Sequence, residues 1–193
     1  MKYTEDYYKS INYTDYLSRY SKYLQTASEI TTLLEKITLV KKESKILDFG
    51  CATGFLLEAL STLNYSNCHG YDISDWACKQ ATEKGSSILE SAKGKFDLVF
   101  CLDVLEHMHD EQIVNFFNEC QAECYVLRIP CSNDEGRSFV LGVSNKDKTH
   151  VNCRTKNQWF KFFDSVGDFL PIFLNTHTIY DSEGVLCCLL IKK

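Results

Sequence analysis

The sequence predicts an α/β protein built on a doubly wound, mostly parallel sheet with an antiparallel C-terminal strand. Three observations predict this class. From about residue 44, short apolar segments alternate with segments of helical periodicity, which is the pattern of crossover connections between parallel strands. A loop bounded by two glycines follows the first apolar segment. The last two strand-like segments are joined by a link too short for parallel strands, so they must pair antiparallel.

The first 43 residues are rich in tyrosine and then helical in pattern. Apolar side chains recur there at helical spacing: Leu24, Ile30, Leu33, Leu34 and Ile37. We therefore expect an N-terminal helical cap over residues 1–43 and a core over residues 44–193. The length of 193 residues predicts a single domain.

The core elements follow from apolar patterning and from capping residues. We expect strands at Lys45–Phe49, Cys68–Ile73, Phe96–Leu102, Glu123–Ile129, Ile172–Thr178 and Val185–Ile191. We expect helices at Phe55–Leu60, Trp76–Lys84, Gln112–Cys120 and Thr155–Val166. Ser74 and Asp110 are the expected N-caps of the second and third helices, and Thr155 and Gln158 have capping-box spacing.

Composition and charge exclude several classes of protein. Hydrophobic residues make up 45% and charged residues 24%, as in ordinary globular proteins, and no apolar run is long enough to cross a membrane. The net charge of −5 gives no reason to expect nucleic acid as a partner. The basic stretch Lys146–Lys161 is an exception, which we interpret as a solvated face. An anionic acceptor is the alternative interpretation.

Ten cysteines are present, but none is arranged as CxxC, and the polar N-terminus shows no signal peptide. We therefore expect reduced thiols in a cytoplasmic protein. His107, His109, His150 and Cys153 are the one set of ligand-type residues that could converge. A cleft residue with several surface residues is the favoured interpretation, so no metal is expected.

The loop Gly50–Gly54 lies at the edge where ligands bind in doubly wound sheets. Its glycines allow the backbone to approach a ligand closely, although an ordinary turn is the alternative for the loop alone. Asp72 ends the second strand, 22 positions after Gly50, where a carboxylate can accept bonds from both hydroxyls of a ribose. The loop lacks GxGxxG, and no P-loop occurs. These residues predict a nucleoside-bearing ligand without a pyrophosphate.

Four segments resemble class I S-adenosylmethionine-dependent methyltransferases, most closely the small-molecule branch related to ubiquinone-biosynthesis methyltransferases. They are ILDFGCATG, GYDIS, FDLVFCLDVLEHM and KTHVNCRTKNQWFKFF, and they extend from about Lys45 to Phe163. The resemblance implies a Rossmann-like fold with a seven-stranded sheet. It also implies S-adenosylmethionine as cofactor, S-adenosylhomocysteine as product, and a small-molecule acceptor.

The resemblance further implies roles for single residues. Those expected around the cofactor are Asp48, Gly50, Cys51, Ala52 and Gly54 at the methionine part, Asp72 at the ribose, Ile73 at the adenine, and Leu102, Asp103 and Val104 on the other side. Ala52 replaces a glycine that many members have. The expected third strand, Gly85–Lys95, is short and poor in apolar residues, so Glu90 is only a nominal contact for the adenine amine.

The implied reaction is an in-line attack of an acceptor oxygen or nitrogen on the sulfonium methyl group. Candidate general bases are His150, His107 and Asp103, whereas Glu106 is expected to be structural. For both histidines, a structural place in a loop or at a helix start is the alternative.

Further alternatives concern the lid and the activity. The N-terminal tyrosines could cover the cofactor, but packing of the N-terminal helix is favoured; they are Tyr7, Tyr8, Tyr13 and Tyr16. Two other functions stay open: a catalytically silent subunit that binds the cofactor for a partner enzyme, and an RNA or phospho-sugar methyltransferase that uses the basic stretch. The sequence identifies neither the acceptor nor the oligomeric state.

Overall fold

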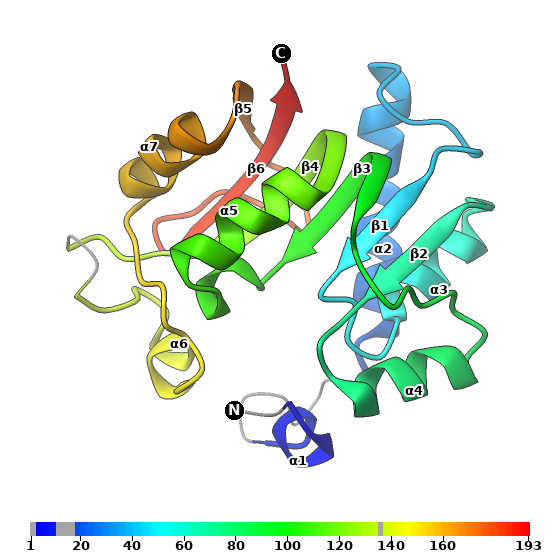
Figure 1. Ribbon diagram of the computed structural model, residues 1–193, viewed down its shortest axis with the longest axis horizontal. Coiled ribbons are helices and arrows are strands. Elements are labelled where there is room, and N and C mark those ends of the chain that lie inside the picture. The colour runs from blue at the N-terminus through cyan, green and yellow to red at the C-terminus, as the bar shows by residue number, and fades with distance from the viewer. Residues whose placement is uncertain (1–2, 11–17, 135–136) are drawn as a thin grey trace.

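A computed structural model describes residues 3–10, 18–134 and 137–193, and its centre is a six-stranded sheet (Figure 1). The strands are β1 (Ile46–Phe49), β2 (Cys68–Tyr71), β3 (Gly94–Leu102), β4 (Cys120–Pro130), β5 (Phe169–Phe173) and β6 (Val185–Lys192). Their order is β2-β1-β3-β4-β6-β5. The first four pair in parallel, and β6 runs antiparallel to both β4 and β5. The predicted mixed sheet with an antiparallel C-terminal strand is confirmed.

The predicted count of seven strands is wrong, because the described residues form six. Residues 85–93 make a single isolated bridge, between Gly70 and Ile88, whereas the last two residues of the expected strand belong to β3. Gly70 donates its amide to the Ser87 carbonyl and accepts the Leu89 amide, each at 2.8 Å. The segment has few apolar side chains to bury on a sheet face, so pairing with β2 stops there.

Helices cover both faces of the sheet (Figure 1). On one face lie α2 (Tyr20–Lys36) and α3 (Phe55–Thr62), and on the other lie α5 (Asp110–Glu119) and α7 (Lys156–Val166). The helix α4 (Asp75–Glu83) follows β2. Three short helices lie near the carboxyl ends of the parallel strands: α1 (Glu5–Tyr8), the 3-10 helix η2 (Leu105–His107) and α6 (Gly142–Lys146).

Alternate residues of the central strands enter opposite layers of the core. In β3, Leu98 and Phe100 pack with α2 and α3, whereas Val99 and Cys101 pack with α5 and α7. All four side chains are fully buried. A strand covered on both faces has no polar side, which explains the continuous apolar run from Leu98 to Leu102 in β3.

Two of the predicted helix caps are confirmed and one is wrong. The Ser74 hydroxyl accepts the Ala77 amide at 3.1 Å at the start of α4. Thr155 and Gln158 form the capping box that begins α7. Asp110 is instead the first residue of α5, one position inside the helix.

The strand predicted at Ile172–Thr178 is displaced toward the N-terminus, since β5 covers Phe169–Phe173. Beyond it, the Thr176 amide donates to the Ile179 carbonyl at 2.8 Å, and this tight turn ends the strand. Within the described ranges, no helix is both long enough and apolar enough to cross a membrane.

Gly70, in β2, is packed too closely to accept a side chain. A Cβ there would lie 2.6 Å from Leu57 Cδ1, 2.7 Å from Cys51 Sγ and 2.9 Å from Ile88 Cδ1. We expect Gly70→Ala to lower the free energy of unfolding by about 1–3 kcal/mol, as overpacking does. Urea unfolding measures this, with Gly142→Ala as control because a Cβ there meets nothing within 4 Å. Equal stability of Gly70→Ala and wild type would contradict this packing.

Candidate functional site

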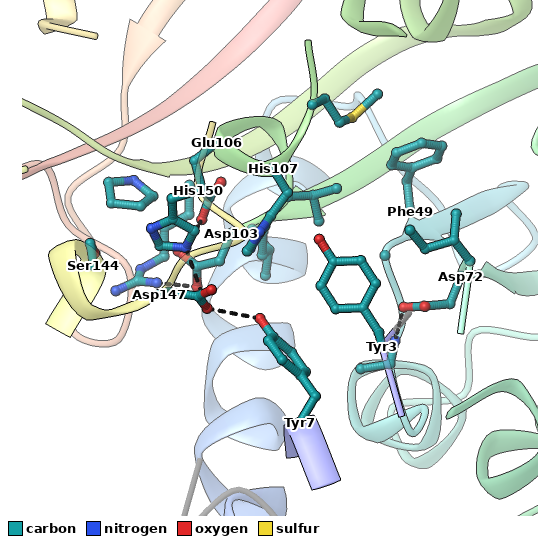
Figure 2. Close-up of a pocket in the computed structure, with 18 of the residues that line it drawn as sticks. Tyr3, Tyr7, Phe49, Asp72, Asp103, Glu106, His107, Ser144, Asp147 and His150 are labelled. Carbon is teal, nitrogen blue, oxygen red and sulfur yellow. Dashed lines mark hydrogen bonds and ion pairs between the residues drawn. The ribbon is translucent and has the colours of Figure 1, made fainter. Parts of the chain in front are cut away.

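A cavity of about 480 Å³ opens at the carboxyl ends of four parallel strands, where a ligand was predicted. Each strand or the loop after it contributes to the wall: Phe49 and Gly50, Tyr71 and Asp72, Leu102 and Asp103, and Arg128 and Pro130. Figure 2 shows Phe49, Asp72 and Tyr3 on one side of the cavity and Asp147 and His150 on the other. The volume is that of a small-molecule site.

The loop after β1 leaves the sheet through a bend that only glycine fits. Gly50 has a φ of +82°, and a Cβ there would lie 2.3 Å from a methyl carbon of Val104. Two residues later, the Ala52 amide donates to Asp72 Oδ2 at 2.8 Å. The ends of β1 and β2 are thereby tied together, and the loop presents its backbone to the cavity.

Asp72 holds this loop with one oxygen and the start of α4 with the other. Its Oδ1 accepts the Ser74 amide at 2.8 Å. Burial raises the pKa of Asp72, and backbone amides, including those of Ser74 and Ala52, oppose the shift. Each carboxylate oxygen has a second lone pair, so Asp72 can also accept hydrogen bonds from a ligand.

Seven of the ten predicted cofactor residues line the cavity: Gly50, Ala52, Asp72, Ile73, Leu102, Asp103 and Val104. The other three do not: Asp48 and Cys51 are buried, and Gly54 is the left-handed residue before α3. Ile73 is 66% exposed, as an apolar side chain open to an apolar ligand would be. Glu90 is exposed and outside the cavity wall.

The opposite side of the cavity is formed by η2 and the segment before α7. The amides of Val151 and Asn152 both donate to the Glu106 carbonyl, each at 2.9 Å. These bonds dock the segment on η2 and bring His150 beside His107, with ring centroids 4.5 Å apart. Two predicted bases that are 43 positions apart in the sequence therefore share one wall.

Hydrogen bonds orient His107. The Thr149 hydroxyl donates to Asp147 Oδ1 at 2.6 Å, so its lone pair faces His107 Nδ1 at 2.8 Å. This arrangement favours a proton on Nδ1 of His107. Asp147 also accepts the Tyr7 hydroxyl at 3.0 Å (Figure 2). Burial favours a higher pKa for Asp147, but the hydrogen bonds from Thr149 keep its pKa below the usual value.

Burial determines the charge of the two histidines. It lowers the pKa of His107 to about 4, and the nearby His150 contributes to this shift. Burial also lowers the pKa of His150, although Asp147 opposes it. Both rings are thus neutral near pH 7. The third predicted base, Asp103, differs because its carboxylate forms an ion pair with Arg128.

One donor atom from each of Glu106, His107 and His150 can be chosen so that all lie within 4.8 Å of one another. Oε1 of Glu106 lies 4.0 Å from Nε2 of His150. One carboxylate and two imidazoles are therefore gathered on this wall, at a spacing at which they could hold a metal ion. His109 and Cys153, which the sequence grouped with these histidines, are not part of the cluster.

The N-terminal segment closes one side of the cavity. The Ser74 hydroxyl donates to the Tyr3 carbonyl at 2.5 Å, and the Tyr3 ring lies edge-on to His107 at 5.8 Å between centroids. Tyr3 is part of the cavity wall, so the volume of about 480 Å³ is what remains open beside its ring. Tyr3 was not among the predicted lid residues, because nothing in the sequence distinguishes it from the other tyrosines of this segment.

The other N-terminal tyrosines divide between packing and lining. Tyr8 is buried and stacks on Trp76 with centroids 5.3 Å apart, as the favoured packing interpretation predicts. Tyr7 lines the cavity beside Asp147, as the lid interpretation predicts. The predicted lid residues Tyr13 and Tyr16 lie outside the described residues.

The basic stretch is partly neutralised within the chain. Arg154 pairs with Asp110 and Lys156 pairs with Asp181, each at 2.6 Å. The cavity wall itself carries four carboxylates, from Asp72, Asp103, Glu106 and Asp147, and the guanidinium groups of Arg19 and Arg128. This balance does not single out an anionic acceptor.

Asp48 generates a prediction about pH. Burial, together with the nearby Asp72, raises the pKa of Asp48 to about 8. The unfolded chain has a value near 4, so the folded state binds this proton more tightly and loses stability as pH rises from about 4 to 8. Asp48→Asn removes this loss. We expect the difference in free energy of unfolding between Asp48→Asn and wild type to increase by several kcal/mol from pH 5 to pH 8.5, at about 1.4 kcal/mol per pKa unit.

Urea unfolding at several pH values measures this difference in the absence of ligand. Glu90→Gln, which neutralises an exposed carboxylate, is the matched control and should follow the wild type. A constant difference between Asp48→Asn and wild type across this pH range would show that Asp48 does not titrate as described.

Comparison with curated proteins finds two O-methyltransferases. Ubiquinone biosynthesis O-methyltransferase of Thiobacillus denitrificans is 38% identical over 80 residues, which is 34% of this chain and 34% of that protein. The mitochondrial ubiquinone biosynthesis O-methyltransferase of Saccharomyces cerevisiae is 27% identical over 121 residues, which is 54% of this chain and 38% of that protein. The matched region spans little more than a third of each relative.

Solved structures share the fold. The magnesium protoporphyrin IX methyltransferase of Synechocystis PCC 6803, crystallised with S-adenosylhomocysteine, aligns with a TM-score of 0.64 over 97% of each chain, at 18% identity. A family model described as a methyltransferase domain matches residues 16–124. That match covers more than half of the chain and includes the loop after β1, Asp72 and η2. The protein therefore belongs to the methyltransferase domain family.

Proposed function

We propose that the protein is an S-adenosylmethionine-dependent methyltransferase that methylates an oxygen or nitrogen of a small molecule. One observation carries this proposal. The cavity has the bend at Gly50 and the Asp72 carboxylate on one side, and the two neutral histidines, His107 and His150, on the other. The first side suits a nucleoside-bearing cofactor, and the second suits an acceptor that must lose a proton.

The residues on the cofactor side fit S-adenosylmethionine. A Cβ at Gly50 would meet Val104, so glycine lets the loop pack closely on the residue that follows Asp103 while its backbone lines the cavity. We assign the methionine part to this loop, the ribose to Asp72 and the adenine to the exposed face of Ile73. The bound cofactor would supply an electrophilic methyl group on its sulfonium sulfur. The name of the structural neighbour, solved with S-adenosylhomocysteine, supports this assignment.

On the acceptor side, the protein would orient the nucleophile and exclude water. His107 and His150 are the predicted bases that keep this role, because Asp103 is held by Arg128. Tyr3 and Tyr7 cover the same space from the N-terminal side. Both curated relatives are named O-methyltransferases, which favours oxygen as the acceptor atom.

The silent-subunit alternative predicts the same cofactor binding without turnover, so a methyl-transfer assay over metabolite pools separates it from the enzyme. The RNA alternative gains no support from the described residues, since two of the basic side chains on which it relied are paired within the chain. Salt-dependent binding to RNA would restore it.

The ribose assignment predicts the behaviour of Asp72→Ala. Loss of charge-assisted hydrogen bonds typically costs about 1.5–3 kcal/mol, so the affinity for S-adenosylhomocysteine should fall by roughly ten- to a hundredfold. Calorimetric titration measures the affinity, and circular dichroism checks the fold. Glu90→Ala, an exposed carboxylate outside the cavity, is the control and should bind like wild type. Wild-type affinity in Asp72→Ala would refute the ribose assignment.

The acceptor-side assignment predicts a different effect for His150→Ala. We expect kcat to fall at least tenfold, while the affinity for S-adenosylhomocysteine changes less than about threefold, because a positioned proton acceptor contributes about 10²–10⁴-fold to rate. His177→Gln, an exposed histidine elsewhere on the chain, should leave both quantities unchanged. If turnover in His150→Ala equals that of wild type, His150 has no part in the reaction.

A further inference from the structure

We propose that Lys84 is a positioning residue for cofactor binding, because it holds the Gly50–Gly54 loop from outside the cavity. Lys84 is the residue that ends α4, and it is not part of the cavity wall. Its effect on binding therefore passes through the loop and not through a contact with the ligand. This role rests on the proposed function, which assigns the loop to the methionine part of the cofactor.

The ammonium group of Lys84 contacts the residues on both sides of Gly54. Its Nζ donates to the Thr53 carbonyl at 3.1 Å and lies 3.5 Å from the Thr53 hydroxyl oxygen. It also lies 3.9 Å from the centre of the Phe55 ring, within the range of a cation–π interaction. Thr53 and Phe55 are both buried. These contacts, called here the Lys84 clamp, therefore attach the end of α4 to the point where the loop becomes α3.

The junction between the loop and α3 has no side-chain cap of its own. Gly54 is the N-cap of α3 and has no side chain that could accept a hydrogen bond from the helix. A Cβ at Gly54 would lie 2.9 Å from Ser86 Oγ and 3.0 Å from Ala81 Cβ. The glycine thus lets α4 and the turn after it pack directly on the loop, and this packing brings Lys84 within reach of Thr53.

The loop needs such support because part of its backbone is strained. Ala52 has a φ of +47° although it carries a side chain. Residues with side chains rarely adopt this conformation, and they keep it only where the surrounding structure holds them there. Asp72 accepts the amide of Ala52, and Lys84 donates to the carbonyl of Thr53, the next residue. Bonds from two different elements therefore hold two successive residues of the turn.

The ammonium of Lys84 is partly dehydrated where it meets the loop. Burial lowers the pKa of Lys84, and the nearby negative charge of Glu58 opposes this shift. An ammonium that has lost part of its water needs other acceptors in its place. The Thr53 carbonyl and the face of the Phe55 ring provide them.

Removing the Lys84 clamp should act on the population of loop conformations. Without the clamp, the turn can relax to conformations in which Ala52 leaves its strained φ. A ligand that binds one of several conformations loses affinity in proportion to the fraction of molecules that still adopt it. Cofactor binding should therefore weaken, whereas the transfer step in the complex, where the loop is again in place, should keep its rate.

The test compares wild type with Lys84→Met, which removes the charge and keeps an unbranched side chain. We expect the affinity for S-adenosylhomocysteine, measured by calorimetric titration of the full chain, to fall roughly three- to thirtyfold. Lys79→Met is the matched control and should bind like wild type, because Lys79 lies on the same helix with its side chain 74% exposed. A change of less than threefold in Lys84→Met would overturn the proposal.

Three further measurements separate positioning of the loop from a general contribution to stability. Amide hydrogen exchange should be faster in residues 50–54 of ligand-free Lys84→Met, while its melting temperature stays within about 3 °C of wild type. In a turnover assay, KM for S-adenosylmethionine should rise while kcat stays within about twofold. A fall in kcat with unchanged KM, or unchanged exchange in the loop, would contradict a positioning role.

The same titrations distinguish this proposal from the proposed function. Binding of S-adenosylhomocysteine to wild type, with equal affinity in Lys84→Met, would refute the role of Lys84 and leave the methyltransferase supported. No binding to wild type would refute the methyltransferase and the role of Lys84 with it. Binding that weakens in Lys84→Met but not in Lys79→Met would support both.

Discussion

The rest of the site depends on the hydrogen bond between the Ala52 amide and the Asp72 carboxylate. It joins the loops that leave two adjacent parallel strands, and it does so only because Gly50 turns the chain at a φ that side chains disfavour. Asp72 uses its other oxygen on Ser74, and the Ser74 hydroxyl in turn holds the Tyr3 carbonyl. The cofactor side of the cavity is thus one connected set of hydrogen bonds.

The acceptor side of the cavity depends on backbone hydrogen bonds between η2 and the segment before α7. The Glu106 carbonyl accepts two amides from the segment before α7, and this places two histidines and a buried carboxylate on one wall. Because the side chains of that wall are largely buried, the pKa values of its two histidines are lowered and Oε2 of Glu106 has no hydrogen-bond partner among the described residues. Burial therefore gives the two histidines the chemistry that the proposed function uses.

The incomplete third strand shapes the remaining side of the cavity. With a single bridge from Ile88 to Gly70, no strand extends the sheet beyond β2 among the described residues. The side assigned to the adenine contains Ile73, whose side chain is largely exposed, and Glu90 is not part of its wall. The adenine ring could therefore pack on Ile73 without a hydrogen bond from Glu90 to its amine.

The sequence by itself determined the succession along the chain of the six strands and of α3, α4, α5 and α7, the antiparallel C-terminal strand, and the positions of Gly50 and Asp72. These features depend on local patterns: apolar runs, caps, and residues at the ends of strands. Tertiary structure alone decided that six strands form, that Tyr3 enters the cavity, and that Glu106, His107 and His150 meet. Their convergence depends on long-range docking between segments about 40 positions apart, and such contacts leave no periodicity in the sequence.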